Sequence, residues 1–323
     1  MAILVTGVAG FIGYHVAKRL LSEGENVIGI DNINDYYDIN LKQHRLARLQ
    51  ANAKFDFYLI DLTDPIPDII TSTPITHIIH LAAQAGVRYS MTNPGAFTQS
   101  NLVGFQNLIH AAKDWQVQNF VYASSSSVYG HEPTPWHEGM SCDSPASLYA
   151  ATKRCNEIVA ASYSTAHRLP TTGLRFFTVY GPLGRPDMFL RHAIKSAAAG
   201  EPIKIFCPEG EDMTRNFTYI DDIVDGILAA MHKPQLNEIY NLASREVVSV
   251  VQAAKMINYA CGGLSKIEYV GYQPGDLLCT EANTEKAQRE LGFNPKWKFE
   301  DGLAMMIREA IGHRRGPLPG ESC

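Results

Sequence analysis

Six short runs rich in β-branched residues recur along the first half of the chain, and longer amphipathic stretches separate them. This alternation is typical of βαβ units, in which a crossover helix follows each strand of a parallel sheet. The predicted strands cover residues 2–6, 26–31, 55–61, 77–82, 119–124 and 171–177. The predicted helices lie near residues 11–23, 40–51, 95–114 and 148–167. We therefore expect an α/β fold built on a doubly wound parallel sheet.

The pattern changes after about Tyr180, where Gly/Pro-rich segments are mixed with shorter helices. This part predicts a smaller, irregular α/β lobe. The apolar run "EIYNLAS" at 238–244 suits one more strand of the main sheet, so the chain is expected to cross between lobes more than once. The expected organisation is a first domain of residues 1–179 to which about 217–258 returns, a second lobe of 180–216 and 259–315, and a flexible tail of 316–323.

The composition narrows the class of protein. The formal charge is -5, from 33 acidic and 28 basic residues, so no basic excess favours a nucleic-acid partner. The six cysteines are scattered without metal-ligand or redox spacing, which indicates no metal site and a reducing compartment. No apolar run approaches the length that spans a bilayer. We expect a cytoplasmic protein without a metal, nucleic-acid or membrane partner.

A glycine-rich turn, "TGVAGFIG", directly follows the first predicted strand and opens the first predicted helix. Gly7, Gly10 and Gly13 suit a tight turn, close approach of the backbone to a pyrophosphate, and helix–strand contact. Phosphates would lie at the positive end of the helix. A glycine triplet alone is a weak signal, but its place between strand and helix predicts a Rossmann-type dinucleotide site.

Asp31 ends the second predicted strand, 18 residues beyond Gly13. A carboxylate there accepts hydrogen bonds from the adenosine ribose and repels a 2′-phosphate, which predicts NAD rather than NADP. The alternative is a purely structural glycine turn with Asp31 as a turn cap. The remaining candidate cofactor contacts lie in the turn, at later strand ends or on the helix that follows: Phe11, Ile12, Asn32, Asp61, Leu62, Ala82, Ala83 and Asn101.

Tyr149 and Lys153 are four residues apart on a predicted helix, so they share one face. Spacing alone decides nothing, because Tyr14 and Lys18 form a second such pair within the first helix. Tyr149 differs in context, since it follows a long loop after the fifth strand, which ends in the hydroxyl-rich "ASSSSVYG". Tyr149, Lys153 and Ser126 are therefore the candidate catalytic residues, and Tyr149 and Lys153 are also expected to contact the cofactor.

The chemistry of a phenol explains this choice. A free tyrosine has a pKa of about 10 and is a poor base near neutral pH unless cations stabilise the phenolate. Lys153 and an oxidised nicotinamide would both do so. The hypothesis is that Tyr149 removes the proton of a secondary alcohol while its hydride passes to NAD, with Ser126 orienting the hydroxyl.

The motifs "TGVAGFIG", "ASSSSVYG", "YAATK" around Tyr149 and "RFFTVYGP" together resemble the extended short-chain dehydrogenase/reductase superfamily, in particular its nucleotide-sugar epimerases and dehydratases. The similarity runs from Ile3 to about Ile311. It implies a Rossmann domain with bound NAD, a second lobe that binds a UDP-sugar, and a homodimer formed by packing of the helices near 95–114 and 148–167.

Three branches of this superfamily are separated by a few residues. The 4,6-dehydratases carry an Asp-Glu pair where this chain has Ser126 and Ser127, and UDP-glucuronate decarboxylases carry a glutamate at the position of Ser127. Most relatives have asparagine where this chain has Thr178. Thr178 with Arg185 resembles the UDP-glucuronate 4-epimerases, and an arginine with a hydroxyl suits a substrate carboxylate.

The resemblance implies an isomerase that oxidises C4, lets the 4-keto sugar turn, and reduces it again. The substrate-binding residues that it implies, besides Ser127, Thr178 and Arg185 at the sugar, are Arg88 at the sugar end and Arg215 and Asp276 at the UDP phosphates and ribose. Asn216 departs from the aspartate that usually follows the arginine, which leaves the packing there open. The alternatives are a 4-epimerase of a neutral UDP-hexose, a UDP-glucuronate decarboxylase, and an inactive NAD-binding scaffold.

Overall fold

Seven parallel strands form the central sheet, in the order β11-β6-β5-β4-β1-β2-β3. The computed structural model describes residues 1–67, 70, 72–272 and 277–312. The strands of the sheet are β1 (Ala2–Thr6), β2 (Val27–Asp31), β3 (Phe55–Leu59), β4 (Ile75–His80), β5 (Asn119–Ser125), β6 (Thr171–Phe176) and β11 (Glu238–Leu242). The predicted doubly wound parallel sheet is confirmed. Its order reverses between β1 and β4, and ligands of such sheets bind at this switch point.

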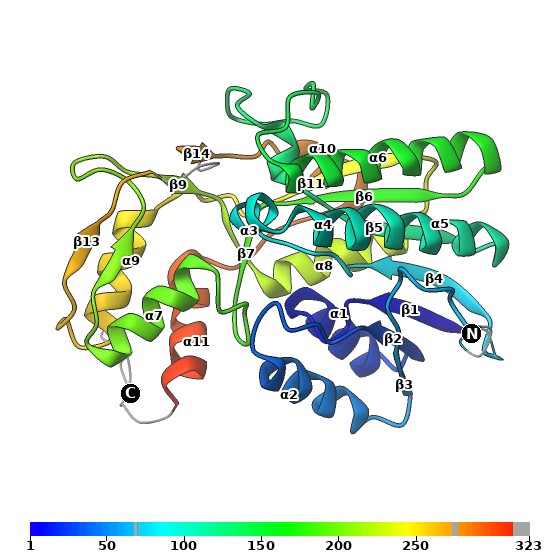
Figure 1. Ribbon diagram of the computed structural model, residues 1–323, viewed down its shortest axis with the longest axis horizontal. Coiled ribbons are helices and arrows are strands. Elements are labelled where there is room, and N and C mark those ends of the chain that lie inside the picture. Colours follow the sequence, from blue (N-terminus) through cyan, green and yellow to red (C-terminus); the bar gives the residue numbers. More distant parts are fainter. Residues whose placement is uncertain (68–69, 71, 273–276, 313–323) are drawn as a thin grey trace.

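Helices cover both faces of the sheet (Figure 1). Helices α1 (Phe11–Ser22), α2 (Ile39–Gln50) and α8 (Ile220–Met231) lie on one face, and α5 (Gly104–Asp114) and α6 (Leu148–His167) lie on the other. Strand β1 shows why both layers are needed. Ile3 and Val5 pack into the apolar cluster around α1 and α8, while Ala2 and Leu4 pack into the cluster around α5.

The helix predicted over residues 95–114 is divided. Helix α3 (Val87–Thr92) and the short α4 (Pro94–Phe97) precede a π-helical turn at Thr98–Val103, and α5 continues from there. Pro94 starts α4 because it cannot donate a backbone hydrogen bond. By contrast, the helix predicted over 148–167 is found as α6, and Ser147 caps its N-terminus by accepting a hydrogen bond from the Ala150 N–H at 3.2 Å.

The second lobe is assembled from short elements (Figure 1). Strands β8 (Ile203–Ile205) and β13 (Ile267–Tyr269) pair beside α7 (Phe189–Ala199), α9 (Val250–Ala260) and α11 (Phe299–Ile311). Two further small sheets join the lobes. They comprise β7 (Thr178–Tyr180) with β10 (Phe217–Tyr219), and β9 (Thr214–Arg215) with β12 (Val248–Ser249) and β14 (Cys279–Thr280).

The chain crosses between the lobes more than once. The run expected to return to the main sheet is β11, which pairs with β6 from Glu238↔Thr172 to Leu242↔Phe176. Helix α8 also lies under the main sheet, and α10 (Glu285–Leu291) packs beside β11. Helix α9 instead packs against α7 and β8 in the second lobe, so the returning segment ends before it. Within the described ranges, no helix is long and apolar enough to cross a membrane.

Asn216 ties three segments together where the lobes meet. Its side-chain nitrogen donates to the Ser244 and Glu246 carbonyls at 3.1 and 2.8 Å, and its side-chain oxygen accepts from the Ala282 N–H at 2.8 Å. The residue is buried. An amide can donate and accept at once, whereas an aspartate carboxylate can only accept. The local structure therefore requires asparagine at this position.

We predict that Asn216→Asp destabilises the protein by about 3 kcal/mol, because a buried carboxylate would face two carbonyl oxygens without a donor. Chemical denaturation measures the loss of unfolding free energy. Asn52→Asp is the matched control, since Asn52 only accepts a hydrogen bond from the Lys54 N–H at 3.0 Å and a carboxylate does the same. Equal stability of the two variants would contradict the assignment.

Candidate active site

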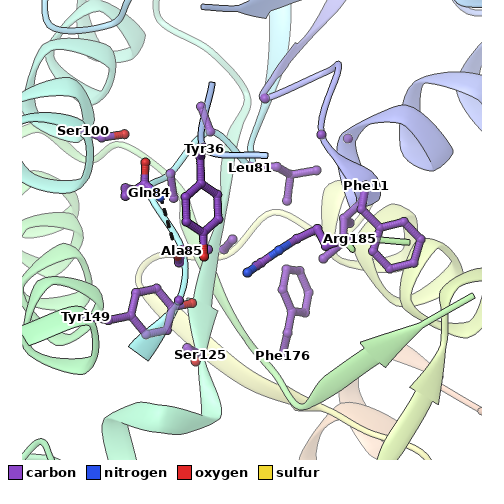
Figure 2. A pocket seen from close by; sticks show the side chains of 18 of the residues that line it. Phe11, Tyr36, Leu81, Gln84, Ala85, Ser100, Ser125, Tyr149, Phe176 and Arg185 are labelled. Carbon is purple, nitrogen blue, oxygen red and sulfur yellow. Dashed lines mark hydrogen bonds between the residues drawn. The ribbon is translucent and has the colours of Figure 1, made fainter. Parts of the chain in front are cut away.

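A pocket of about 430 Å³ opens at the carboxyl ends of the central strands. Figure 2 shows its wall, with Tyr149 and Ser125 on one side and Phe11 and Arg185 on the other. The glycine turn, the ends of β2, β4 and β5, helix α6 and the segment around 176–188 all contribute to it. This is the edge of the sheet at which the sequence predicts a ligand.

The glycine turn forms the floor of this pocket. Gly7 has a φ of 68°, and a Cβ added there would lie 2.7 Å from the Ala82 backbone nitrogen. A Cβ on Gly13 would lie 2.1 Å from the Gly7 carbonyl oxygen. The first turn of α1 receives no side-chain cap, so its N–H groups face the pocket. The turn thus fits a dinucleotide pyrophosphate, which needs close backbone approach and N–H donors.

Asp31 has a structural task as well as a place on the wall. Its carboxylate accepts from the Ala9 N–H at 3.0 Å and the Ile33 N–H at 2.8 Å. Burial raises the pKa of Asp31, and these N–H bonds together with Lys42 oppose the rise. Asp31 therefore caps the turn and also lines the pocket beside the glycine turn.

The second group of cofactor candidates lies at the ends of β2, β3 and β4. Asn32 donates to the Asp61 carboxylate at 2.8 Å. Burial alone would raise the pKa of Asp61, but the hydrogen bonds from Asn32 and Thr63 lower it, so this acid is charged at neutral pH. Candidates that line the same pocket are Gly10, Phe11, Ile12, Asn32, Asp61, Leu62, Ala82 and Ala83.

Asn101 is the exception, because it lies behind the wall. It is buried in the π-helical turn, where it accepts from the Gln84 N–H at 2.8 Å and donates to the Gln84 carbonyl and the Thr152 hydroxyl, both at 3.0 Å. These bonds support Gln84, which itself lines the pocket. The direct contact of Asn101 with the cofactor stays a prediction.

Tyr149 and Lys153 line the pocket from α6, as expected. Lys153 is buried and donates to the Ala123 carbonyl of β5 at 2.9 Å. Burial lowers the pKa of Lys153 to about 8. Burial also raises the pKa of Tyr149, and a hydrogen bond with Ser125 and the positive charge of Arg185 oppose that rise. The positive charge of Arg185, a residue chosen from the sequence only for the substrate, thus also favours the phenolate.

Ser125 contacts Tyr149, although sequence reasoning did not single it out. Strand β5 ends at Ser125, and a 3₁₀ turn, η3 (Ser126–Tyr129), follows. Ser125 forms the hydrogen bond with Tyr149, while Ser126 and Ser127 also line the pocket. The catalytic role expected for Ser126 stays a prediction. Four consecutive serines look alike in a sequence, and only the end of the strand decides which hydroxyl faces the tyrosine.

A buried ion pair supports the serines from behind. Glu157, on α6, forms two hydrogen bonds with Arg175 of β6, both at 2.9 Å, and accepts a third from the Ser124 hydroxyl at 2.6 Å. Arg154 adds a further contact to Glu157 at 3.0 Å. The pair fixes α6 to the ends of β5 and β6, which sets Tyr149 against the serine stretch.

The structure brings only part of the expected substrate set together. Ser127, Thr178 and Arg185 line the pocket with Tyr149. Arg88 is not on this wall, and its guanidinium lies over the Phe206 ring at 4.2 Å. Arg215 is also off the wall and donates to the Thr214 and Leu277 carbonyls at 2.8 and 2.6 Å. Asp276 lies outside the described residues. The sugar contact of Arg88 and the nucleotide contacts of Arg215 and Asp276 therefore stay predictions.

Two residues near Arg185 had no signal in the sequence. Asp187 pairs with Arg185, with Nε–Oδ1 and Nη2–Oδ2 distances of 3.1 and 2.5 Å, and Tyr36 donates to the same carboxylate at 3.1 Å. Burial raises the pKa of Tyr36 to about 12, so it stays a neutral donor. In the described part of the chain, no group of His, Cys, Asp and Glu side chains could hold a metal ion.

Comparison with known proteins agrees with this geometry. The chain is 42% identical over 307 residues to UDP-glucuronate 4-epimerase of Thermodesulfobacterium geofontis, with 94% of each chain covered. It is 39% identical over 327 residues to Protein CapI of Staphylococcus aureus, covering 95% of this chain and 97% of that protein.

Solved structures give the same result. UDP-glucuronic acid 4-epimerase from Bacillus cereus, in complex with UDP-glucuronic acid and NAD, matches with a TM-score of 0.90 and 32% identity over 96% of this chain and 99% of its own. UDP-glucose 4-epimerase of Thermus thermophilus with NAD matches with a TM-score of 0.87 and 27% identity, over 97% and 100%. The profile of the NAD dependent epimerase/dehydratase family matches residues 3–243. The chain therefore belongs to the NAD dependent epimerase/dehydratase family.

Proposed function

We propose that this protein interconverts UDP-glucuronate and UDP-galacturonate by epimerisation at C4. The observation that carries the proposal is the composition of one pocket, in which Tyr149 with Ser125 faces Arg185 and Thr178 above the glycine turn. A neutral UDP-hexose needs no arginine at the sugar, whereas a sugar acid does. Sequence identity supports the same choice. The two UDP-glucuronate 4-epimerases compared above are 42% and 32% identical to this chain, whereas the UDP-glucose 4-epimerase of Thermus thermophilus is 27% identical.

NAD is the cofactor, and when bound it would accept the hydride from C4 and return it. The chain would hold it with the glycine turn at the pyrophosphate and with Asp31 at the adenosine ribose. Asp31 also disfavours a 2′-phosphate, because that carboxylate is already held in place by two N–H groups and would face another anion.

Tyr149 is the base in this proposal. It takes the proton of the C4 hydroxyl as the alcohol becomes a ketone, and it returns the proton when the other face of C4 is reduced. Ser125 hydrogen-bonds the phenol, and Ser126, on the same pocket wall, orients the reacting hydroxyl. Lys153 fixes the helix to β5 through Ala123 and adds positive charge, which is largest below its pKa of about 8.

Thr178 and Arg185 hold the substrate carboxylate. The 4-keto sugar acid is a β-keto acid. It loses carbon dioxide if the bond from C5 to the carboxylate aligns with the ketone, because the electron pair of that bond then passes to the ketone oxygen as an enolate. A fixed carboxylate keeps this bond out of alignment, so the same two side chains serve binding and product choice.

The first test is incubation of the purified protein with UDP-glucuronate without added cofactor, and again with added NAD. We expect UDP-galacturonate, resolved by chromatography, and slower conversion of UDP-glucose in a parallel reaction. Faster conversion of UDP-glucose, or no galacturonate even with NAD, would overturn the proposed substrate.

The second prediction concerns the base. Tyr149→Phe should lower the turnover number by a factor on the order of 10²–10⁴ with bound NAD unchanged, because only the proton carrier is lost. Tyr14→Phe is the matched control, since Tyr14 also precedes a lysine by four residues but is buried in the core. If both variants kept normal activity, Tyr149 would not be the base.

A homodimer through the outer faces of α5 and α6 is also part of the proposal. The two helices lie side by side on one outer surface (Figure 1). Val103, which directly precedes α5, and Ile158 of α6 are large apolar residues with 36% and 56% of their surface exposed. Exposed apolar side chains on neighbouring helices favour a protein contact.

We predict that Ile158→Arg yields a monomer, because a charge buried in the contact would have no partner. Light scattering after gel filtration measures the mass. Leu264→Arg is the control, since Leu264 is 84% exposed in the second lobe, away from these helices. A wild-type protein that is monomeric at micromolar concentration would refute the dimer.

A cytoplasmic location completes the proposal and rests on cysteine chemistry. Cys142, Cys155, Cys207 and Cys279 are free thiols. Proteins that keep their cysteines as thiols are typical of reducing compartments.

A further inference from the structure

Arg185 is held along one edge by Asp187. Its Nε donates to Oδ1 at 3.1 Å and its Nη2 to Oδ2 at 2.5 Å. A guanidinium has five N–H donors in a fixed plane, so this side-on pair uses two of them. The Tyr36 hydroxyl forms a further hydrogen bond with the guanidinium, so three of the five donors are used and two remain for another acceptor. In Figure 2 the guanidinium extends into the pocket from the side opposite Tyr149.

Tyr36 holds Asp187 in turn. Its hydroxyl donates to Oδ2 of Asp187 at 3.1 Å, and the Arg185 guanidinium lies 5.8 Å from its ring centroid. The Tyr36 ring packs on Tyr89 with centroids 4.8 Å apart. Gly86 leaves room for it, because a Cβ there would lie 2.5 Å from the Tyr36 hydroxyl. Tyr36 thus contacts three segments at the pocket mouth and has little freedom to move.

The loop that carries Arg185 and Asp187 is anchored by its backbone as well. The buried Arg45 of α2 donates to the Leu183 carbonyl at 2.6 Å and to the Ala9 carbonyl of the glycine turn at 2.9 Å. His15 of α1 forms a hydrogen bond with the Pro182 carbonyl at 3.0 Å. The orientation of Arg185 therefore depends on elements of the dinucleotide-binding half.

We infer that Asp187 and Tyr36 together position Arg185. They direct the outer end of its guanidinium toward the sugar carboxylate. This inference rests on the proposed function and deepens it. A side-on bond on one edge leaves an end-on bond as the geometry offered to a second carboxylate. Without Asp187, Arg185 has several rotamers and can meet the carboxylate along either edge, so the bond from C5 to the carboxylate is no longer kept out of alignment with the ketone.

The test compares product ratios in the NAD-loaded protein. With UDP-glucuronate, Asp187→Asn should raise the ratio of decarboxylated UDP-pentose, in 4-keto and reduced forms together, to UDP-galacturonate by about tenfold, which corresponds to about 1.4 kcal/mol. Tyr36→Phe removes one hydroxyl and should raise the ratio in the same direction by a smaller factor. Inhibition by UDP, which lacks the sugar acid, should not change in either variant.

The matched control is Asp225→Asn. Asp225 pairs with Arg19 at 2.8 Å, and its side chain is 43% exposed compared with 35% for Asp187, but it lies away from the pocket. Its product ratio should equal that of the wild type. Wild-type ratios in both Asp187→Asn and Tyr36→Phe would overturn the inference, as would a loss of UDP affinity as large as the change in ratio. A wild-type protein that does not convert UDP-glucuronate refutes the proposed function instead.

Discussion

The architecture depends on a contact between two backbones that leaves no room for a side chain. Gly7 lies against the end of β4, where a Cβ would approach Ala82 to 2.7 Å, and Gly13 lies against Gly7 itself. Because these backbones touch, the ends of β1 and β4 form one floor at the point where the strand order reverses. The start of α1 then faces a pocket instead of packed side chains. Every group assigned to the chemistry is arranged around that floor.

The side wall of the pocket depends on a different restraint, because α6 must hold Tyr149 against the end of β5. The Glu157–Arg175 pair provides it from within the protein. Both side chains are almost fully buried, and removing one partner of such a pair typically costs about 3–5 kcal/mol. The pair also holds the Ser124 hydroxyl, so the orientation of the serine stretch and that of the helix are set by the same carboxylate. A shift of α6 would disturb both sides of the proposed proton transfer together.

Much of the fold and of the pocket could be predicted from the sequence, because the motifs that indicate them are local. The glycine turn, the strand periodicity, Asp31 and the Tyr149–Lys153 spacing each depend on neighbours along the chain. Where a contact depends on segments far apart in the chain, the sequence indicated less. Asn101 is on the expected helix, but its amide is used by Gln84 and Thr152, which come from elsewhere in the chain. The choice among four serines depends on where a strand ends, and the pairing of Tyr36 with Asp187 joins residues 151 positions apart.

The charges around Tyr149 show why the site suits the positively charged nicotinamide ring of oxidised NAD. Burial favours the neutral forms of both Tyr149 and Lys153, since it raises the pKa of the first and lowers that of the second to about 8. The Lys153 ammonium donates one hydrogen bond to the Ala123 carbonyl, and Asp187 offsets part of the charge of Arg185. The chain's own groups therefore leave the pKa of Tyr149 above its ordinary value. A bound nicotinamide ring, which is positively charged when oxidised, would add charge that favours the phenolate.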